Sequence, residues 1–291
     1  MAAISSASDI RNTVTAILKI FREIRWGGWS LISLYISVLS GVVVALQYSP
    51  ETPLYSISTM DLLVPFGAYF RSLHFYSSQL FFLFSILHLI AVFEQTQAYS
   101  TKQWIKLTAT LPIALLLLFT GYILRGDSTG SSAGLIAEAI LLDLPFIGQP
   151  LNDLFFSISD NGMKRIYVNH IIGLGVLWGW LAWTHIKKYM VPFTQHIPLT
   201  IATLLFSVGV AAPFDPEHLG VFHISGPWFF LGLQELLIHL HPLLAGFFFP
   251  SSFLISLALL QKKNRGYRWY MLYTLIWLLA YAILTTIGLN R

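Results

Sequence analysis

The chain has 291 residues, of which 56% are hydrophobic and only 10% are charged. In a soluble domain roughly a quarter of all residues are charged, so most of this protein's surface does not face water. The sequence contains no cysteine, which excludes disulfides, thiolate metal sites and thioether-linked cofactors. The net charge of +4 reflects the placement of basic residues described below, and no nucleic-acid partner is expected from it.

The N-terminal residues 1–28 predict an amphipathic, basic segment that rests on the membrane surface. A helix needs about 20 apolar residues to cross the hydrocarbon layer. Seven stretches approach that length, the fifth being short: 29–48, 73–93, 106–124, 168–189, 197–212, 242–260 and 269–289. The predicted fold is an all-α membrane protein with about seven spans, in which a four-helix bundle (29–195) is followed by three further helices (196–291).

Lysine and arginine are distributed unevenly between the two sides of these spans. If the N-terminus is cytoplasmic, twelve of the seventeen basic residues lie on that side and ten of the thirteen acids on the other. Cytoplasmic loops carry this excess of basic residues, so the N-terminus is predicted to be cytoplasmic. Two long connections, 125–167 and 213–241, fall on the acidic side, and their apolar pieces 134–144 and 227–240 predict helices along the membrane surface.

Four histidines lie inside two non-adjacent spans. His74 and His88 are 14 positions apart, and His170 and His185 are 15 apart. At about 100° and 1.5 Å per residue, these spacings rotate roughly −40° and +60° and rise about 21–22 Å. Each helix therefore presents two histidines toward roughly one side, one near each membrane surface.

A lone buried histidine is usually a neutral imidazole bonded to a neighbour, but four at matching depths favour a functional reading. Zinc requires three or four ligands at one point, whereas a haem takes two axial nitrogens on opposite faces of a flat ring. Both spans run from the acidic to the basic side, so His74 is predicted to pair with His170 near the acidic side and His88 with His185 near the basic side. Small residues would let the ring approach the backbone: Gly41, Gly173, Gly175 and Gly179.

Basic residues near the pairs are candidates for the haem carboxylates. Arg71 lies one turn before His74, and a snorkelling anchor is the alternative. Lys187 and Lys188 could serve the basic-side haem, or could be ordinary residues of the cytoplasmic side.

These features resemble the cytochrome b family of Rieske/cytochrome b complexes over nearly the whole chain. The segment RSLH, followed 14 positions after its histidine by a second one, is similar to the family's second helix. The segment SGVVVALQYSP is similar to the first helix. There Gly41, and either Gly27 or Gly28, match glycines that lie near the haems. TGYILRG with Gly121 resembles the third helix, LPFIGQPLNDLFF the following surface helices, and GPWFFL the region of the quinol-site signature Pro-Glu-Trp-Tyr.

The resemblance implies two non-covalent, bis-histidine haem b groups that carry electrons between two quinone pockets and couple this to proton translocation. It further implies a multi-pass subunit of an energy-converting membrane, such as a bacterial inner membrane, in a homodimeric complex. The expected partners are membrane lipid, quinone, a Rieske-type iron–sulfur protein and a c-type or multihaem cytochrome. One chain alone is not expected to be a complete enzyme.

The sequence departs from the family at the acidic-side quinol site. With Trp228 aligned to the signature, Pro227 replaces the proton-accepting Glu and Phe229 replaces the Tyr. Quinol oxidation releases protons, so another acceptor is needed. Glu235 is the first candidate, with a structural hydrogen bond or a subunit contact as its alternative; the others are Asp127, Glu217, His218, His223, His239 and His241.

The basic-side quinone pocket is expected near His88 and His185, with Arg25, His196 and the lysines as candidates for binding and protonation. The altered acidic side leaves a second hypothesis, a quinone-linked anchor and electron wire for a multihaem or molybdenum enzyme. A third is a haem-free transporter with histidine proton relays.

Overall fold

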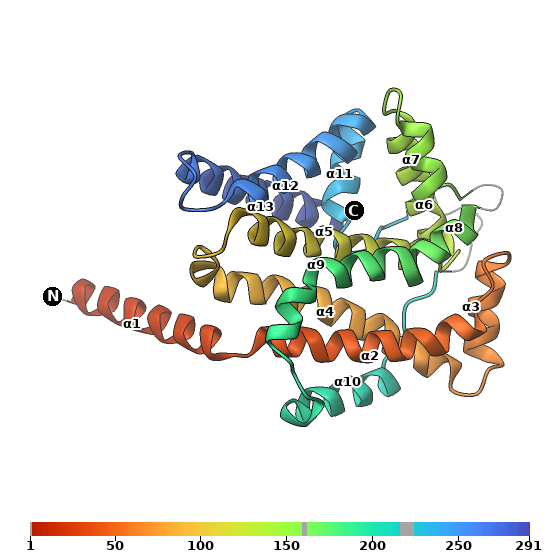
Figure 1. Cartoon of the computed structure of the whole chain (residues 1–291), viewed down its shortest axis with the longest axis horizontal. Coiled ribbons are helices and arrows are strands. Elements are labelled where there is room, and N and C mark those ends of the chain that lie inside the picture. The colour runs from red at the N-terminus through yellow and green to blue at the C-terminus, as the bar shows by residue number, and fades with distance from the viewer. Residues whose placement is uncertain (1, 159–161, 216–223) are drawn as a thin grey trace.

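The computed structural model describes residues 2–158, 162–215 and 224–291, and these residues form helices and contain no strand. The predicted all-α class is therefore confirmed (Figure 1). In chain order the helices are α1 (Ala2–Glu23), α2 (Trp26–Gln47), α3 (Pro53–Leu62), α4 (Gly67–Thr96), α5 (Thr101–Ile123), α6 (Ser128–Leu142), α7 (Gly148–Phe155), α8 (Gly162–Val168), the π-helix η1 (Asn169–Gly173), α9 (Leu174–Lys188), the 3₁₀ turn η2 (Phe193–Gln195), α10 (Ile197–Gly209), α11 (Leu231–His239), the π-helix η3 (Leu243–Phe248), α12 (Phe249–Leu259) and α13 (Tyr267–Leu289).

Within the described ranges, five helices are long and apolar enough to cross a membrane: α2, α4, α5, the continuous run Gly162–Lys188, and α13. The other two expected spans are helical but shorter. Helix α10 has 13 residues, about 20 Å, against a hydrocarbon layer of about 30 Å. It ends at Gly209, and the backbone is extended at Val210; three residues after the helix, Ala212 N–H donates to Ser72 Oγ on α4 at 2.9 Å. The stretch 242–260 is divided between the π-helix η3 and α12.

Helices α2 and α4 lie against each other along most of their length (Figure 1). Their contact is formed by small polar residues that let two backbones approach closely. Ser30 Oγ is 2.8 Å from Ser85 Oγ, and Ser77 Oγ donates to Leu73 O within its own helix. The buried hydroxyls on α2 share one face: Ser30, Ser33, Ser37 and Ser40.

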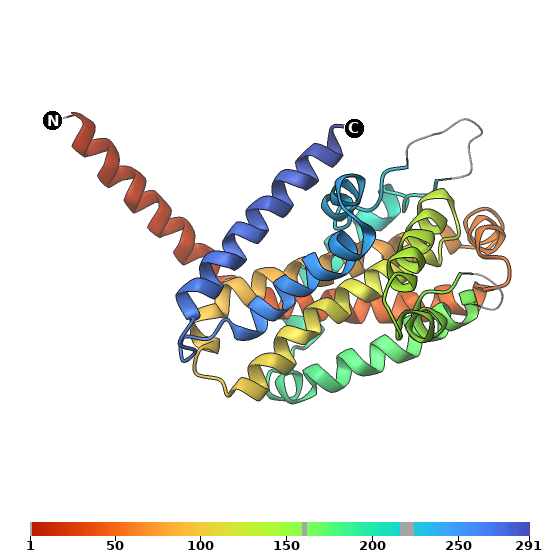
Figure 2. The same ribbon diagram turned by 90° about the horizontal axis from the view of Figure 1, so that it is seen from above.

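Helix α5 packs mainly on α9, and the α5–α9 pair faces the α2–α4 pair across the bundle (Figure 2). Helix α10 covers α4, while α11 packs on α13. The acidic-side pieces expected to be helical form α6 and α11. Helix α1 projects away from the bundle in both views.

The C-terminal helices join the bundle through Trp104 on α5. Its side chain is 1% exposed and packs with Leu257 and Leu260. The indole Nε1–H donates to the backbone oxygen of Leu257 on α12 at 3.0 Å. The same carbonyl also accepts the backbone N–H of Leu260 at 3.1 Å, so the indole uses the second acceptor position of an oxygen at the C-terminal end of α12.

Replacement of Trp104 by Phe should therefore lower the thermal stability of the detergent-solubilised protein. The lost hydrogen bond is worth about 1 kcal/mol, and the vacated ring volume adds to the loss. The matched control is Trp269→Phe on α13, where the side chain is 75% exposed and no effect is expected. Equal melting temperatures for the two variants would contradict this role of Trp104.

Candidate functional site

The structure brings the four histidines together in two pairs. His74 and His88 lie on α4, His170 lies in η1, and His185 lies on α9. The ring centroids of His74 and His170 are 6.2 Å apart, and those of His88 and His185 are 6.0 Å apart. Among the described residues, no group of three or more His, Cys, Asp or Glu side chains could hold a metal ion, so the arrangement is two separate pairs.

Both separations fit one metal ion shared by two imidazoles. Metal–nitrogen bonds of about 2 Å, extended on each side to the centre of the ring, place two coaxial imidazoles roughly 6 Å apart. Direct imidazole–imidazole packing would not require the same separation twice at opposite ends of the bundle.

The acidic-side pair is held in one tautomer by its neighbours. His74 Nδ1 is 2.8 Å from the backbone oxygen of Ser37, and because a carbonyl only accepts, this nitrogen carries the proton. His170 Nδ1 is 3.0 Å from Thr120 Oγ1, whose own proton is directed to Leu116 O at 2.8 Å. Thus Nδ1 donates in both rings and Nε2 keeps its lone pair for a ligand.

A π-turn explains how unequal spacings produce matched pairs. His170 lies in the π-helix η1, whose i→i+5 hydrogen bonds include one residue more than an α-turn. The extra residue absorbs about 100° of rotation, so the 15-position spacing on this helix acts like the 14-position spacing on α4. The ideal-helix estimate of +60° is thereby corrected to roughly −40°, which is the value expected for the other helix.

Glycines lie directly against three of the imidazoles. A Cβ atom on Gly27 would be 2.9 Å from His88, one on Gly41 would be 2.8 Å from His74, and one on Gly121 would be 3.2 Å from His170. The first two distances are closer than side chains approach in practice. Of the two alternatives near the basic-side pair, Gly27 contacts the histidine, whereas Gly28 lies against His196.

A cavity of about 760 Å³ adjoins the acidic-side pair, within the range of cofactor sites. Its wall includes Gly175 and Gly179, where a Cβ atom would meet nothing within 4 Å. Gly173, the third glycine of this helix, packs instead on Asn169. The cavity, lined largely by apolar side chains and open in front of two glycines, fits a flat apolar ring better than a small ion.

Two arginines, Arg71 and Arg125, carry the positive charge in this cavity wall. Arg71 is 8% exposed, and its Nη2 lies 2.5 Å from Asp61 Oδ2. Arg125 is 6% exposed and is ion-paired with Asp127 and with Asp215, the latter at 3.1 Å. Arg71 thus occupies the expected place beside the acidic-side histidines, already bonded to a carboxylate on one side.

The basic-side candidates form a second group. His196 is 6% exposed, and its Nε2 lies 2.5 Å from the position of a Cβ on Gly28. Burial, followed by the charge of Arg25, lowers the pKa of His196 below 6.5, so its imidazole is neutral at pH 7. Arg25 Nη1 donates to Gln195 Oε1 at 3.3 Å. Lys187 and Lys188 are exposed at the end of α9.

The acidic-side candidates do not line the cavity, but two of them contact residues that do. Trp228 Nε1 donates at 2.9 Å to Gln79, and the Phe229 ring is 5.6 Å from Tyr122; Gln79 and Tyr122 both line the cavity. Pro227 O accepts from Phe230 N at 2.7 Å. Pro227 therefore supplies a backbone acceptor where the family has a carboxylate.

Neither acidic candidate is free to accept a proton without breaking other contacts. Glu235 is 2% exposed and its Oε1 lies 3.1 Å from both Arg291 and His239. Asp127 is fully buried, caps α6 through Gly130 N at 2.9 Å, and pairs with Arg125. Their geometry favours the structural alternative for both residues; Glu217, His218 and His223 lie outside the described residues.

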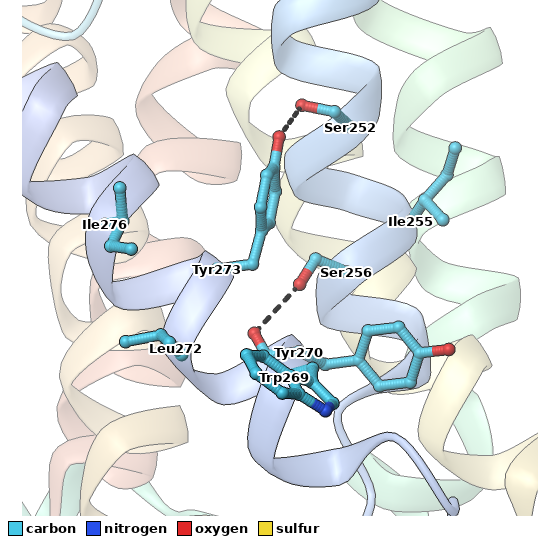
Figure 3. A pocket seen from close by; sticks show the side chains of 8 residues that line it. All are labelled: Ser252, Ile255, Ser256, Trp269, Tyr270, Leu272, Tyr273 and Ile276. Carbon is cyan, nitrogen blue, oxygen red and sulfur yellow. Dashed lines mark hydrogen bonds between the residues drawn. The ribbon is translucent and has the colours of Figure 1, made fainter.

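A separate open groove lies between α12 and α13 (Figure 3). It measures about 540 Å³, and its wall includes Ile255, Trp269 and Ile276. Tyr273 Oη donates to Ser252 Oγ at 2.6 Å, and Ser256 Oγ donates to Tyr270 O at 3.1 Å. None of the predicted site residues lines this groove.

Sequence reasoning missed the residues that orient the site. Ser37 and Thr120 bond the two imidazoles, and Asp61 and Asp215 hold the arginines. Ser37 and Thr120 could have been identified as polar residues inside apolar spans. Ser37 lies four positions before Gly41, and Thr120 lies one position before Gly121.

Comparison with known proteins identifies the bundle. Residues 12–190 match the family model for cytochrome b/b6/petB. Cytochrome b6 of Heliobacterium modesticaldum is 30% identical over 154 residues, which is 50% of this chain and 72% of that protein. Cytochrome b6 of Heliomicrobium gestii is 29% identical over the same shares.

A solved structure described as a hyperthermophilic respiratory Complex III matches with a TM-score of 0.68 at 18% identity. The match covers 90% of this chain and 82% of the other, so the similarity of fold extends beyond residue 190 into the C-terminal helices. The family match and the helices long enough to cross a membrane show that this chain is an integral membrane protein of the cytochrome b/b6 family, an electron-transfer subunit that binds haem b.

Proposed function

We propose that this chain is the di-haem b subunit of a membrane quinol:cytochrome c-type oxidoreductase. The observation that carries the proposal is the pair of His–His separations, 6.2 and 6.0 Å, at opposite ends of α4. His74 and His170 would hold the acidic-side haem, and His88 and His185 the basic-side haem. Each haem supplies a one-electron carrier, so two in series let electrons cross the bilayer.

The chain's own residues orient and shield these carriers. Ser37 and Thr120 fix the imidazole tautomers on the acidic side, and the glycines against the rings keep the helix backbones close to them. The apolar walls exclude water, which lowers the local dielectric and makes nearby charges more effective in setting a reduction potential.

Proton uptake on the basic side is assigned to His196. Its buried imidazole next to Arg25 can take up a proton from the basic side and pass it to a reduced quinone, and its lowered pKa makes the protonated form a stronger donor. The excess of lysine and arginine supports a cytoplasmic location for this side and for the N-terminus, and the proposed membrane is a bacterial inner membrane. Quinone, a Rieske-type protein and a cytochrome are the expected partners, in keeping with the Complex III to which the fold is similar.

The acidic side supports a second candidate, a quinone-linked electron wire for a different redox complex. The segment that carries the altered signature is packed with aromatic rings: Phe229 lies against Tyr122 at 5.6 Å, and Phe230 against Phe119 at 5.3 Å. Both phenylalanines are buried. Pro227 stands in place of the carboxylate, so the described part of this segment has no acidic side chain at the position of the usual proton acceptor.

Stepwise reductive titration of the purified complex should resolve two b-type haems per chain. Because each haem depends on its own pair, His185→Leu should lower the haem content from two to one and leave the acidic-side haem at its original potential. The control His241→Gln changes an exposed histidine (its side chain is 64% exposed) and should retain both. A wild-type protein with one haem, or with none, would rule out the di-haem proposal.

His196→Gln should slow the quinone-dependent reoxidation of the basic-side haem by about 10²-fold, the lower end of the usual range for general acid–base catalysis. In the wild type the rate should change as the pH falls below 6.5, because the pKa of His196 lies below that value. The variant should lose this pH dependence. A variant that keeps the wild-type profile would show that another group delivers the proton.

Inhibitors of quinol oxidation distinguish the two candidate functions. If the acidic-side segment is a filled, silent site, such inhibitors should leave electron transfer through the haems unchanged. Full inhibition at stoichiometric concentration would favour the first candidate. The composition of the complex isolated from its native membrane provides an independent check, since a Rieske protein is expected only for that candidate.

A further inference from the structure

The acidic-side cavity has two buried guanidinium groups in its wall. Arg71 and Arg125 line it together with His74 and His170. Arg71 was expected from the sequence, whereas Arg125, just after α5, was not among the predicted site residues. Nothing in the proposed function uses Arg125.

Both arginines form ion pairs with carboxylates. Arg71 Nε and Nη2 donate to Asp61 at 2.7 and 2.5 Å. Arg125 Nε donates to Asp127 at 2.9 Å, and its Nη2 bonds both Asp127 and Asp215, the latter at 3.1 Å. These bonds fix the planes of both guanidiniums at the cavity wall.

One short segment ties the two arginines together. Arg71 donates to Ala212 O at 3.0 Å and to Pro213 O at 3.2 Å, and Asp215 of the same segment pairs with Arg125. Asp215 N also donates to Asp127 Oδ2 at 2.9 Å. The segment 212–215 therefore bonds both arginines in the wall of the same cavity.

The charge of Arg125 is only partly neutralised by its partners. Asp127 also accepts Gly130 N and Asp215 N and caps the N-terminus of α6, where the helix dipole already favours a negative charge. The Asp215 side chain is 54% exposed and is screened by water. Arg125 bonds through Nε and Nη2, and its Nη1 has no hydrogen-bond partner within the described part of the chain, so two of its five N–H donors are available at the cavity.

We infer that Arg125 binds a carboxylate of the acidic-side haem, so that Arg71 and Arg125 take one propionate each. A guanidinium matches a carboxylate in geometry and retains its charge at any physiological pH. This inference rests on the proposed function, because it requires a haem between His74 and His170. A positive charge beside that haem favours its reduced form and raises its potential relative to the same site without the charge.

The test is potentiometric titration of the intact complex carrying Arg125→Gln. The acidic-side haem should become harder to reduce by about tenfold in its redox equilibrium, a fall of ~59 mV for one electron, while the basic-side haem is unchanged. Arg71→Gln should act in the same direction. Lys164→Gln removes one charge from the same membrane side, at an exposed ion pair with Glu51, and should shift neither haem.

Asp215→Asn distinguishes haem binding by Arg125 from a purely structural role of Arg125. It removes a negative charge behind Arg125, so the acidic-side haem should become easier to reduce, opposite to Arg125→Gln. If Arg125 only fastens the segment 212–215, both substitutions loosen the same contact and shift the haem in the same direction. That result, or an unshifted haem in Arg125→Gln, would overturn the inference.

Arg125→Lys, which keeps the positive charge, tests the case in which Arg125→Gln no longer binds the acidic-side haem. If Arg125→Gln loses the acidic-side haem, retention of two haems in the Lys variant, with potentials near those of the wild type, supports the inference. Loss of that haem in the Lys variant as well contradicts it. A wild-type complex with no acidic-side haem would instead refute the proposed function on which the inference depends.

Discussion

The structure depends on one constraint, that two imidazoles from different helices must face each other about 6 Å apart with their Nε2 lone pairs free. This requirement explains why polar groups occur in the most apolar part of the chain. A buried hydroxyl or carbonyl without a partner is costly in a membrane, and here Ser37 O and Thr120 Oγ1 each accept a hydrogen bond from an imidazole Nδ1–H. The same bonds satisfy both groups and select the tautomer, so stability of the bundle and readiness to bind metal depend on the same contacts.

Helix packing follows from the same constraint. An imidazole pair can span two helices only if the neighbouring backbones leave room for the rings, and the close approach at Gly27, Gly41 and Gly121 shows how little room there is. On the fourth span the opposite condition holds, because Gly175 and Gly179 face open space at the cavity. Glycine therefore has two roles here: on α2 and α5 it accommodates the histidines, and on α9 it leaves space beside them.

The sequence predicted the parts of this arrangement that depend on local periodicity. The all-α class, most of the spans and the partners within each histidine pair follow from hydropathy and from 100° per residue. The π-turn at His170 did not follow, because its hydrogen bonds are set by packing and have no compositional signature. Helix α10 was expected to be longer because Ala212 is apolar; its backbone N–H is instead bonded to Ser72 far away in the sequence. Likewise, Glu235 and Asp127 were candidates as isolated acids, and only the fold shows their partners Arg291 and Arg125.

The two ends of the proposed electron path differ in how charge is arranged. At the basic end the groups near the histidines include a neutral, buried His196 with its lowered pKa and the exposed lysines Lys187 and Lys188, which can exchange protons with water. At the acidic end the charges are locked: Asp61, Asp127 and Asp215 each hold an arginine, and aromatic rings surround the altered signature. Fixed charges change a reduction potential without moving protons. In the proposed electron path, the fixed charges of the acidic end tune the electron carrier, and any proton released there passes to a group beyond this ion-pair network.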